Sequence, residues 1–320
     1  MSEALSTYPG FARPIPSPTN TWLTPWYGST VVPITLGSGA TVPVPMLFWN
    51  TQSLVLHGVA DADAVDGLLL REYGLRAQLV NPDNLLEPKP DGGKAWVQIW
   101  APDYQATTVG PIKAVFASVA VESRRGCPAD HQGLGHGWWW WYYGNSVVNH
   151  EFKQNVWGMP SRLGVLETAY QTDVKSARLV ENGSIALRLR CDLKNHTRWL
   201  ILNGEGGDDA GREPGYEERL RRYCEKLAAG KGKPARLVVV SRRRHDDGEN
   251  DVDLVGAKLL GDRPDGALSF RGKGSDFYTG KDTAVRYKLE AVGFEPVAWD
   301  YYTDYSGVVK IYDDQGSARL

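Results

Sequence analysis

The sequence predicts an α+β fold that is mostly antiparallel β, with the strands arranged as a barrel and a few helices at its periphery. Three features predict it: short stretches of alternating apolar and polar residues recur, polar turns separate them, and few segments show helical spacing. We find no linker and no repeat of fixed period, so residues 46–320 are expected to form a single domain. The proline-rich residues 1–45 are expected to form an extended N-terminal arm.

The composition is that of a globular protein, with 42% hydrophobic and 23% charged residues in a chain of 320. The net charge of -2 gives no reason to expect nucleic acid or an anionic membrane as a partner. The three cysteines lie far apart, and there is neither a long apolar run nor a signal-peptide pattern, so we expect a cytoplasmic protein. The 12 tryptophans suit a pocket wall or a subunit interface as well as a β-rich core.

The first half of the chain begins with an expected strand over residues 46–60. Asp61 then offers an N-terminal cap, and apolar residues at helical spacing follow it, which predicts a helix. Residues 94–100 alternate between aliphatic residues and larger aromatic or polar ones, which is typical of a strand with two different faces. A longer strand is expected over residues 111–122.

The second half contains six consecutive aromatic residues, 138–143, which are expected to form a strand with alternate side chains on opposite faces. Residues 147–156 are expected to form a short helix and residues 217–229 a longer one. Further strands are expected over residues 163–172, 176–180, 184–193, 237–241, 254–260, 285–289 and 308–312.

Common motifs for cofactors and metals are missing from the sequence. Residues 133–137 are rich in glycine but do not have the GxGxxG spacing of a dinucleotide site. The acidic residues 245–253 lack the central glycine of a calcium-binding loop. No HExxH zinc motif and no GxSxG nucleophile elbow occurs. We therefore expect no cofactor and no metal.

Residues 138–164, WWWWYYGNSVVNHEFKQNVWGMPSRLG, resemble the acetoacetate decarboxylase-like superfamily. That superfamily has an aromatic strand, a short helix, and then a turn of the type aromatic-x-x-Pro-Lys-Lys-Leu-Gly. The resemblance extends upstream to Glu122 and its neighbours, and more weakly to residues 48–70. It implies an acetoacetate decarboxylase-like barrel and assembly into a homo-oligomer.

The resemblance also implies a chemistry, in which a lysine amine forms a Schiff base with a β-keto acid. The reactive lysine of the superfamily falls on Ser161, its neighbouring lysine on Arg162, its acidic residue on Glu122, and an arginine roughly on Thr51. A serine hydroxyl does not form an iminium with a ketone, so a Schiff base is not expected at this position. A relocated amine, on Lys113 or Lys153, is an alternative.

The remaining residues suggest a site without a Schiff base. Glu122 would transfer a proton, Arg162 would stabilise charge on an oxygen, and Ser161 would donate a hydrogen bond to it. Substrate-binding side chains are expected at Trp157, Met159, Phe116, Trp139, Trp141, Tyr143 and Thr51. Each catalytic residue has a structural alternative, namely an ion pair for Glu122 and Arg162 and a turn for Ser161.

The sequence therefore predicts a cofactor-independent enzyme of small-molecule metabolism, of a secondary-metabolite or polyketide-like kind. Its reaction would be a cyclisation, dehydration or isomerisation of an apolar, oxygenated substrate, and a pericyclic ring closure is one variant. Two alternatives remain open: a binding protein of the same fold without activity, and a decarboxylase or lyase that uses a relocated lysine.

Overall fold

The computed structural model describes residues 32–44, 46–73, 76–81, 84–88, 93–121, 135–155, 160–170, 174–192, 200–201, 236–239, 256–260, 266–270 and 276–310. Most of the expected arm, residues 1–45, lies outside these ranges. The described part of the arm is an antiparallel hairpin formed by β1 (Val32–Thr35) and β2 (Thr41–Val44). Among the described residues, no helix is both long and apolar enough to cross a membrane.

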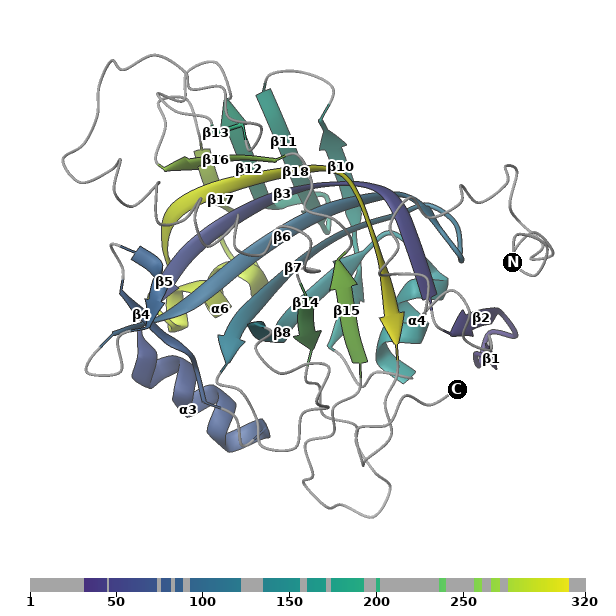
Figure 1. The fold of residues 1–320 in the computed structure, drawn as a ribbon, viewed down its shortest axis with the longest axis horizontal. Coiled ribbons are helices and arrows are strands. Elements are labelled where there is room, and N and C mark those ends of the chain that lie inside the picture. Colours follow the sequence, from purple (N-terminus) through teal and green to yellow (C-terminus); the bar gives the residue numbers. More distant parts are fainter. Residues whose placement is uncertain are drawn as a thin grey trace.

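A large main sheet dominates the molecule (Figure 1). Its long strands are β3 (Met46–Ala60), β6 (Lys94–Thr107), β7 (Ile112–Val121), β8 (Gly135–Gly144) and β18 (Glu295–Lys310). Strand β3 pairs antiparallel with β18 on one side and β6 on the other, and β6, β7 and β8 follow as antiparallel neighbours. Antiparallel pairing therefore predominates among the long strands, as the sequence predicts.

Shorter strands complete the main sheet: β4 (Leu79–Asn81), β5 (Asn84–Pro88), β9 (Ser161–Leu163), β13 (Leu200–Ile201), β14 (Arg236–Val239), β15 (Gly256–Leu260) and β16 (Gly266–Phe270). Strand β8 pairs in parallel with both β9 and β14, which makes the sheet mixed. Strand β14 also pairs with β15, and β15 pairs with β18.

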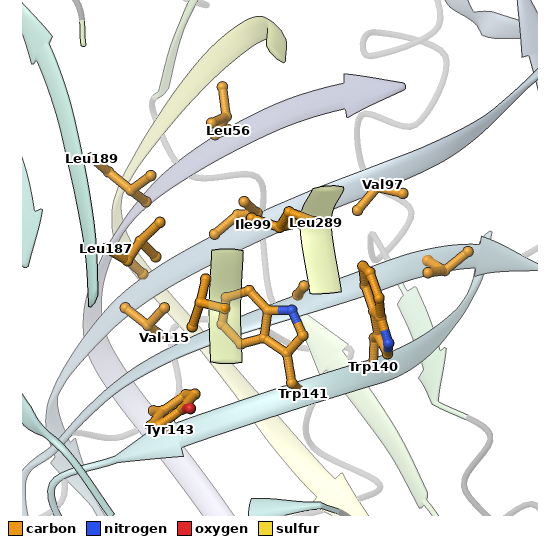
Figure 2. Close-up of a cluster of buried hydrophobic side chains, with 14 of the residues drawn as sticks. Leu56, Val97, Ile99, Val115, Trp140, Trp141, Tyr143, Leu187, Leu189 and Leu289 are labelled. Carbon is orange, nitrogen blue, oxygen red and sulfur yellow. The ribbon is translucent and has the colours of Figure 1, made fainter. Parts of the chain in front are cut away.

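A second sheet of four antiparallel strands contains β10 (Val165–Ala169), β11 (Val174–Glu181), β12 (Ser184–Asp192) and β17 (Asp276–Thr279). A main core of buried side chains lies between the two sheets and the helix α6 (Ala284–Ala291) (Figure 2). The main sheet contributes residues such as Ile99 and Val115, the second sheet Leu187 and Leu189, and α6 Leu289. Burying each such side chain contributes about 1.5–3 kcal/mol of hydrophobic free energy.

Several local predictions are confirmed. Strand β3 spans the expected residues 46–60, and residues 94–100 form the first half of β6 with their aliphatic side chains in the main core. The expected helix after Asp61 is α3 (Ala62–Tyr73), and the Asp61 carboxylate accepts a hydrogen bond from the backbone N–H of Ala64 at 2.8 Å. The expected helix over residues 147–156 is α4 (Val147–Asn155).

Other predictions are wrong. Residues 285–289 were expected to be a strand and belong instead to α6, where Thr283 caps the first turn and accepts a hydrogen bond from the backbone N–H of Arg286 at 3.3 Å. The strand expected over residues 163–172 is interrupted at Gly164, whose N–H donates to the carbonyl of Gly144 at 3.1 Å and separates β9 from β10. The expected helix over residues 217–229 lies outside the described residues.

Candidate active site

A small pocket lies on the face of the main sheet opposite the main core. Alternate side chains of β3 point to opposite faces of the sheet. Leu54 and Leu56 belong to the main core, whereas Val55 belongs to a second cluster around the pocket. The empty space of the pocket, including its mouth, is about 330 Å³. It is lined by Met46, Phe48, Tyr104, Thr107, Ile112, Trp139, Tyr142, Asn149 and Lys153.

Helix α4 supplies the polar side of this pocket. Asn149 and Lys153 are four residues apart and therefore lie on the same face of the helix, where they are 2% and 3% exposed. The Lys153 Nζ lies 4.4 Å from the ring centroid of Trp139 and 5.6 Å from that of Tyr142. A lysine buried this completely is uncommon, and its position over the faces of two aromatic rings suits an ammonium group.

The phenol of Tyr142 is the second polar group in the pocket. The side-chain amide of Asn149 donates a hydrogen bond to the Tyr142 oxygen at 2.6 Å. Burial raises the pKa of Tyr142 far above its ordinary value, and the bond from Asn149 opposes this shift only in part. The phenol therefore stays neutral over the physiological range, as a hydroxyl able to donate a hydrogen bond.

A β-bulge divides the aromatic side chains of β8 between the two faces. The register of β7 against β8 shifts by one residue opposite Trp140, so Trp140 and Trp141 both point into the main core. Trp139 points into the pocket instead, whereas Tyr143 lies in the main core with Trp141 (Figure 2). The predicted substrate-binding set of Trp139, Trp141 and Tyr143 is thus split, because strict alternation does not hold across the bulge.

Two further predicted residues lie next to the pocket wall. Phe116 stacks on Tyr142 with ring centroids 5.8 Å apart and stands behind the pocket lining. Thr51 pairs with Tyr104 across β3 and β6, is fully buried, and has no hydrogen-bond partner for its Oγ1 within the described ranges. Thr51, predicted to bind substrate, thus carries a buried hydroxyl.

Ser161 and Arg162 do not line the pocket. The Ser161 Oγ lies 3.1 Å from the Nδ1 of His150, and its carbonyl accepts a hydrogen bond from the side-chain amide of Gln154 at 2.9 Å. The Arg162 side chain is 60% exposed, and its Nη1 lies 3.6 Å from the carboxylate of Glu181. The structural alternative for Arg162, an ion pair, is the arrangement observed.

Glu122, Trp157 and Met159 lie outside the described residues. Of the two lysines considered for a relocated amine, Lys113 lies 3.6 Å from the carboxylate of Asp103 with its side chain 35% exposed, and Lys153 lies in the pocket. Asn149 and Tyr142 were not predicted to be site residues. The four-residue spacing of Asn149 and Lys153 within an expected helix is the feature of the sequence that indicates a shared face.

No set of three or more His, Cys, Asp or Glu side chains that could hold a metal ion is found within the described ranges. The polar groups of the described pocket lining are instead an amine, an amide, a threonine hydroxyl and the phenols of two tyrosines. Such groups suit the binding of a neutral or anionic oxygen compound.

Searches with protein-family models and against curated protein sequences found no match. Among solved structures, the chain is similar to an acetoacetate decarboxylase from Legionella pneumophila, with 14% identity, a TM-score of 0.47 and coverage of 84% of this chain and 88% of that one. It is also similar to the enduracididine biosynthesis enzyme MppR, with 12% identity, a TM-score of 0.48 and coverage of 90% and 97%. A third similar structure is an acetoacetate decarboxylase-like enzyme from Sphingomonas wittichii. It has 12% identity and a TM-score of 0.46, with coverage of 88% of this chain and 95% of that one.

Proposed function

We propose that this protein is an acetoacetate decarboxylase-like enzyme that acts on a small carbonyl compound in the pocket beneath α4. Lys153 would supply the amine that the motif at Ser161 has lost. The observation that carries this proposal is the Lys153 side chain, which is 3% exposed and lines an aromatic pocket. The relocated-lysine alternative is therefore favoured over the acid–base mechanism, whose Arg162 is paired on the surface.

The proposed reaction begins with attack of the neutral Lys153 amine on a ketone carbon. Proton transfer to the oxygen and loss of water give an iminium, which accepts the electron pair of a breaking bond on the adjacent carbon. If that bond leads to a carboxylate, carbon dioxide leaves and an enamine remains. Protonation of the enamine, followed by addition of water, releases the product ketone and restores the amine, so the water lost on formation is returned.

The pocket around Lys153 supports this chemistry. The neutral amine is the nucleophile in this chemistry, and the contacts of the Lys153 Nζ with Trp139 and Tyr142 place that nitrogen inside the pocket. The Tyr142 hydroxyl lies next to the amine-bearing helix and is held by Asn149, so we assign it the hydrogen bond to the substrate oxygen. The remaining lining is mostly apolar, with Phe48, Trp139 and Ile112, which suits an apolar, oxygenated substrate of the kind found in secondary metabolism.

We also propose that the main sheet closes into a barrel around this pocket. The supporting observation is the series of strand pairs from β3 through β6, β7, β8, β14, β15 and β18, the last of which pairs with β3 again. A barrel places the pocket face of each strand in an enclosed interior. Residues 46–320 would form this single domain.

The test of the amine is reductive trapping. The purified protein is incubated with 2-butanone and sodium cyanoborohydride, and the modified peptide is identified by mass spectrometry. We expect the label on Lys153, no label at this position in Lys153→Arg, and an unchanged yield in the matched control Lys113→Arg. Absence of label on Lys153, or labelling no faster than that of surface lysines, would contradict the proposal.

The same purified protein also distinguishes the two alternative functions, the acid–base mechanism and the binding protein without activity. If Lys153 stays unlabelled, a native substrate is turned over, and Glu122→Gln abolishes that turnover, then the acid–base mechanism with Glu122 is correct. If an extract compound is retained by the protein and never changed, the binding-protein alternative is correct. Thermal melting of each variant shows that a loss does not reflect unfolding.

A further inference from the structure

Helix α4 depends on contacts with neighbouring segments for its position. It has nine residues, whereas an isolated helix in water needs about 12–15 residues to be even marginally stable. Phe152 and Val148, four residues apart, pack against the apolar cluster around the pocket, but apolar contacts are not directional. Directional hydrogen bonds are needed to hold the Lys153 Nζ over a particular ring.

Ser161 makes such bonds with two residues of α4. His150 and Gln154 are four residues apart and lie on the helix face adjacent to that of Asn149 and Lys153. The His150 Nδ1 contacts the Ser161 Oγ at 3.1 Å, and the Gln154 amide donates to the Ser161 carbonyl at 2.9 Å. One buried residue thus holds a full turn of the helix.

Ser161 is also fixed to the strand that carries the rings. It is the first residue of β9, which pairs in parallel with β8, and in that register Ser161 lies opposite Tyr142. Strand β8 also carries Trp139, the ring under the Lys153 Nζ. Ser161 therefore connects the helix that bears the amine to the strand that bears the aromatic partners of that amine.

We propose that Ser161 is a positioning residue that sets the place of the Lys153 amine over Trp139, acting through His150 and Gln154. This inference rests on the proposed function of Lys153. The serine at the position of the superfamily's reactive lysine then has a definite role. Ser161 is only 2% exposed and has the His150 ring within hydrogen-bond distance, so a longer side chain here would have to displace that ring.

The first experiment measures reductive trapping at Lys153 as a function of 2-butanone concentration. For Ser161→Ala we expect the maximal trapping rate to fall about tenfold, because misplacement by a fraction of an ångström slows bond formation. The half-saturating ketone concentration should stay unchanged, because the strands that line the pocket are intact. Ser161→Thr, which keeps the hydroxyl, should restore most of the rate.

The matched control is Thr168→Ala, which removes a hydroxyl bonded to Asp103 at 2.6 Å on β10, away from α4. It should trap at the wild-type rate. Ser161→Ala keeps the carbonyl that accepts from Gln154, so wild-type trapping rates in both Ser161→Ala and Gln154→Ala would overturn the positioning role while leaving the proposed function of Lys153 intact. If the wild-type protein also shows no trapping of 2-butanone at Lys153, the proposed function itself is refuted.

A second measurement tests the positioning role independently of any reaction. Hydrogen exchange of the amides of residues 147–155 reports how firmly α4 is held. We expect faster exchange in Ser161→Ala than in Thr168→Ala or the wild type, with the amides of α6 unchanged. Equal exchange in all three proteins would overturn the positioning role even if Lys153 proves unreactive.

Discussion

Helices α4 and α6 have nearly the same length but bury different kinds of side chain. Helix α6 buries Val285 and Leu289 in the main core and is capped by Thr283. Helix α4 buries the apolar Phe152 and, in addition, the polar residues Asn149 and Lys153. The first arrangement is what hydrophobic burial alone produces, whereas the second places two polar groups where desolvation is unfavourable unless partners are provided.

The two helices also differ in the hydrogen bonds that hold them in place. The side-chain hydrogen bonds of α6 are local, namely its cap and the pair of Arg286 with Glu290 one turn later. The hydrogen bonds that hold α4 reach Tyr142, Ser161 and the β1–β2 hairpin, all outside the helix. A helix stabilised from outside, with polar groups facing a pocket, is the arrangement expected of an element that serves a site.

The largest effect on stability should come from breaking the apolar contact of α6. For Leu289→Ala we expect a loss of about 2–4 kcal/mol in the free energy of unfolding, because a buried side chain in the main core is replaced by a cavity. Urea unfolding measures the loss. Reductive trapping at Lys153 by the folded variant should be unchanged, and a reduced trapping rate would show that α6 also shapes the pocket.

A smaller effect on stability, together with an effect on the site, is expected for α4. Asn149→Ala removes the donor to the buried Tyr142 oxygen and should cost about 1–2 kcal/mol. The same variant should lower the trapping rate at Lys153, whereas the cap variant Thr283→Ala, at about 1 kcal/mol, should leave it alone. Equal trapping rates in the two variants would contradict the difference drawn between the helices.

The outer side of α4 should be sensitive to acid. The hydroxyl and the backbone N–H of Ser38 both donate to the carboxylate of Glu151, and these bonds lower the pKa of Glu151 below its ordinary value. Since the pKa is lowered in the folded protein, the carboxylate stabilises the fold above its unfolded pKa, near 4.3, and this contribution is lost as the pH falls through the folded pKa. The hairpin should therefore loosen from α4 under acid conditions.

This loosening is measurable as the change in urea midpoint between about pH 6 and about pH 3. Ser38→Ala should lose less stability over this range than the wild type, because its Glu151 pKa is closer to the ordinary value. The control is Glu290→Gln, which removes a carboxylate from another helix and leaves the contact of Ser38 with Glu151 intact. A wild-type pH dependence in Ser38→Ala would show that the bond from the Ser38 hydroxyl is irrelevant to acid stability.

The smallest effect should come from Arg162, which neighbours the positioning residue Ser161. The Arg162 side chain of the pair with Glu181 is 60% exposed, so Arg162→Ala should change the free energy of unfolding by no more than about 0.5–1 kcal/mol. Trapping at Lys153 should be unchanged. A strong loss of trapping or of turnover would restore the interpretation of Arg162 as a group that stabilises charge on the substrate.

Local signals in the sequence determined much of this molecule. The cap at Asp61, the alternation over residues 94–100 and the short helix after residue 146 were all predictable, because each depends on neighbours within a few positions. The same local view failed at residues 285–289. Their apolar residues fit both a two-residue and a four-residue period, and only packing of one face on the main core selects the helix.

The site required the tertiary structure. The bulge at Trp140 decides which tryptophans face the pocket, and a shift of one residue reverses every face beyond it. The sequence offered Lys113 and Lys153 alike as a relocated amine. In the structure Lys113 pairs with Asp103 near the surface, whereas Lys153 lies over Trp139. Long-range strand pairing determines such positions. The sequence by itself therefore determined which residue types were present and which local elements they form, and the packing of distant strands decided which of them meet.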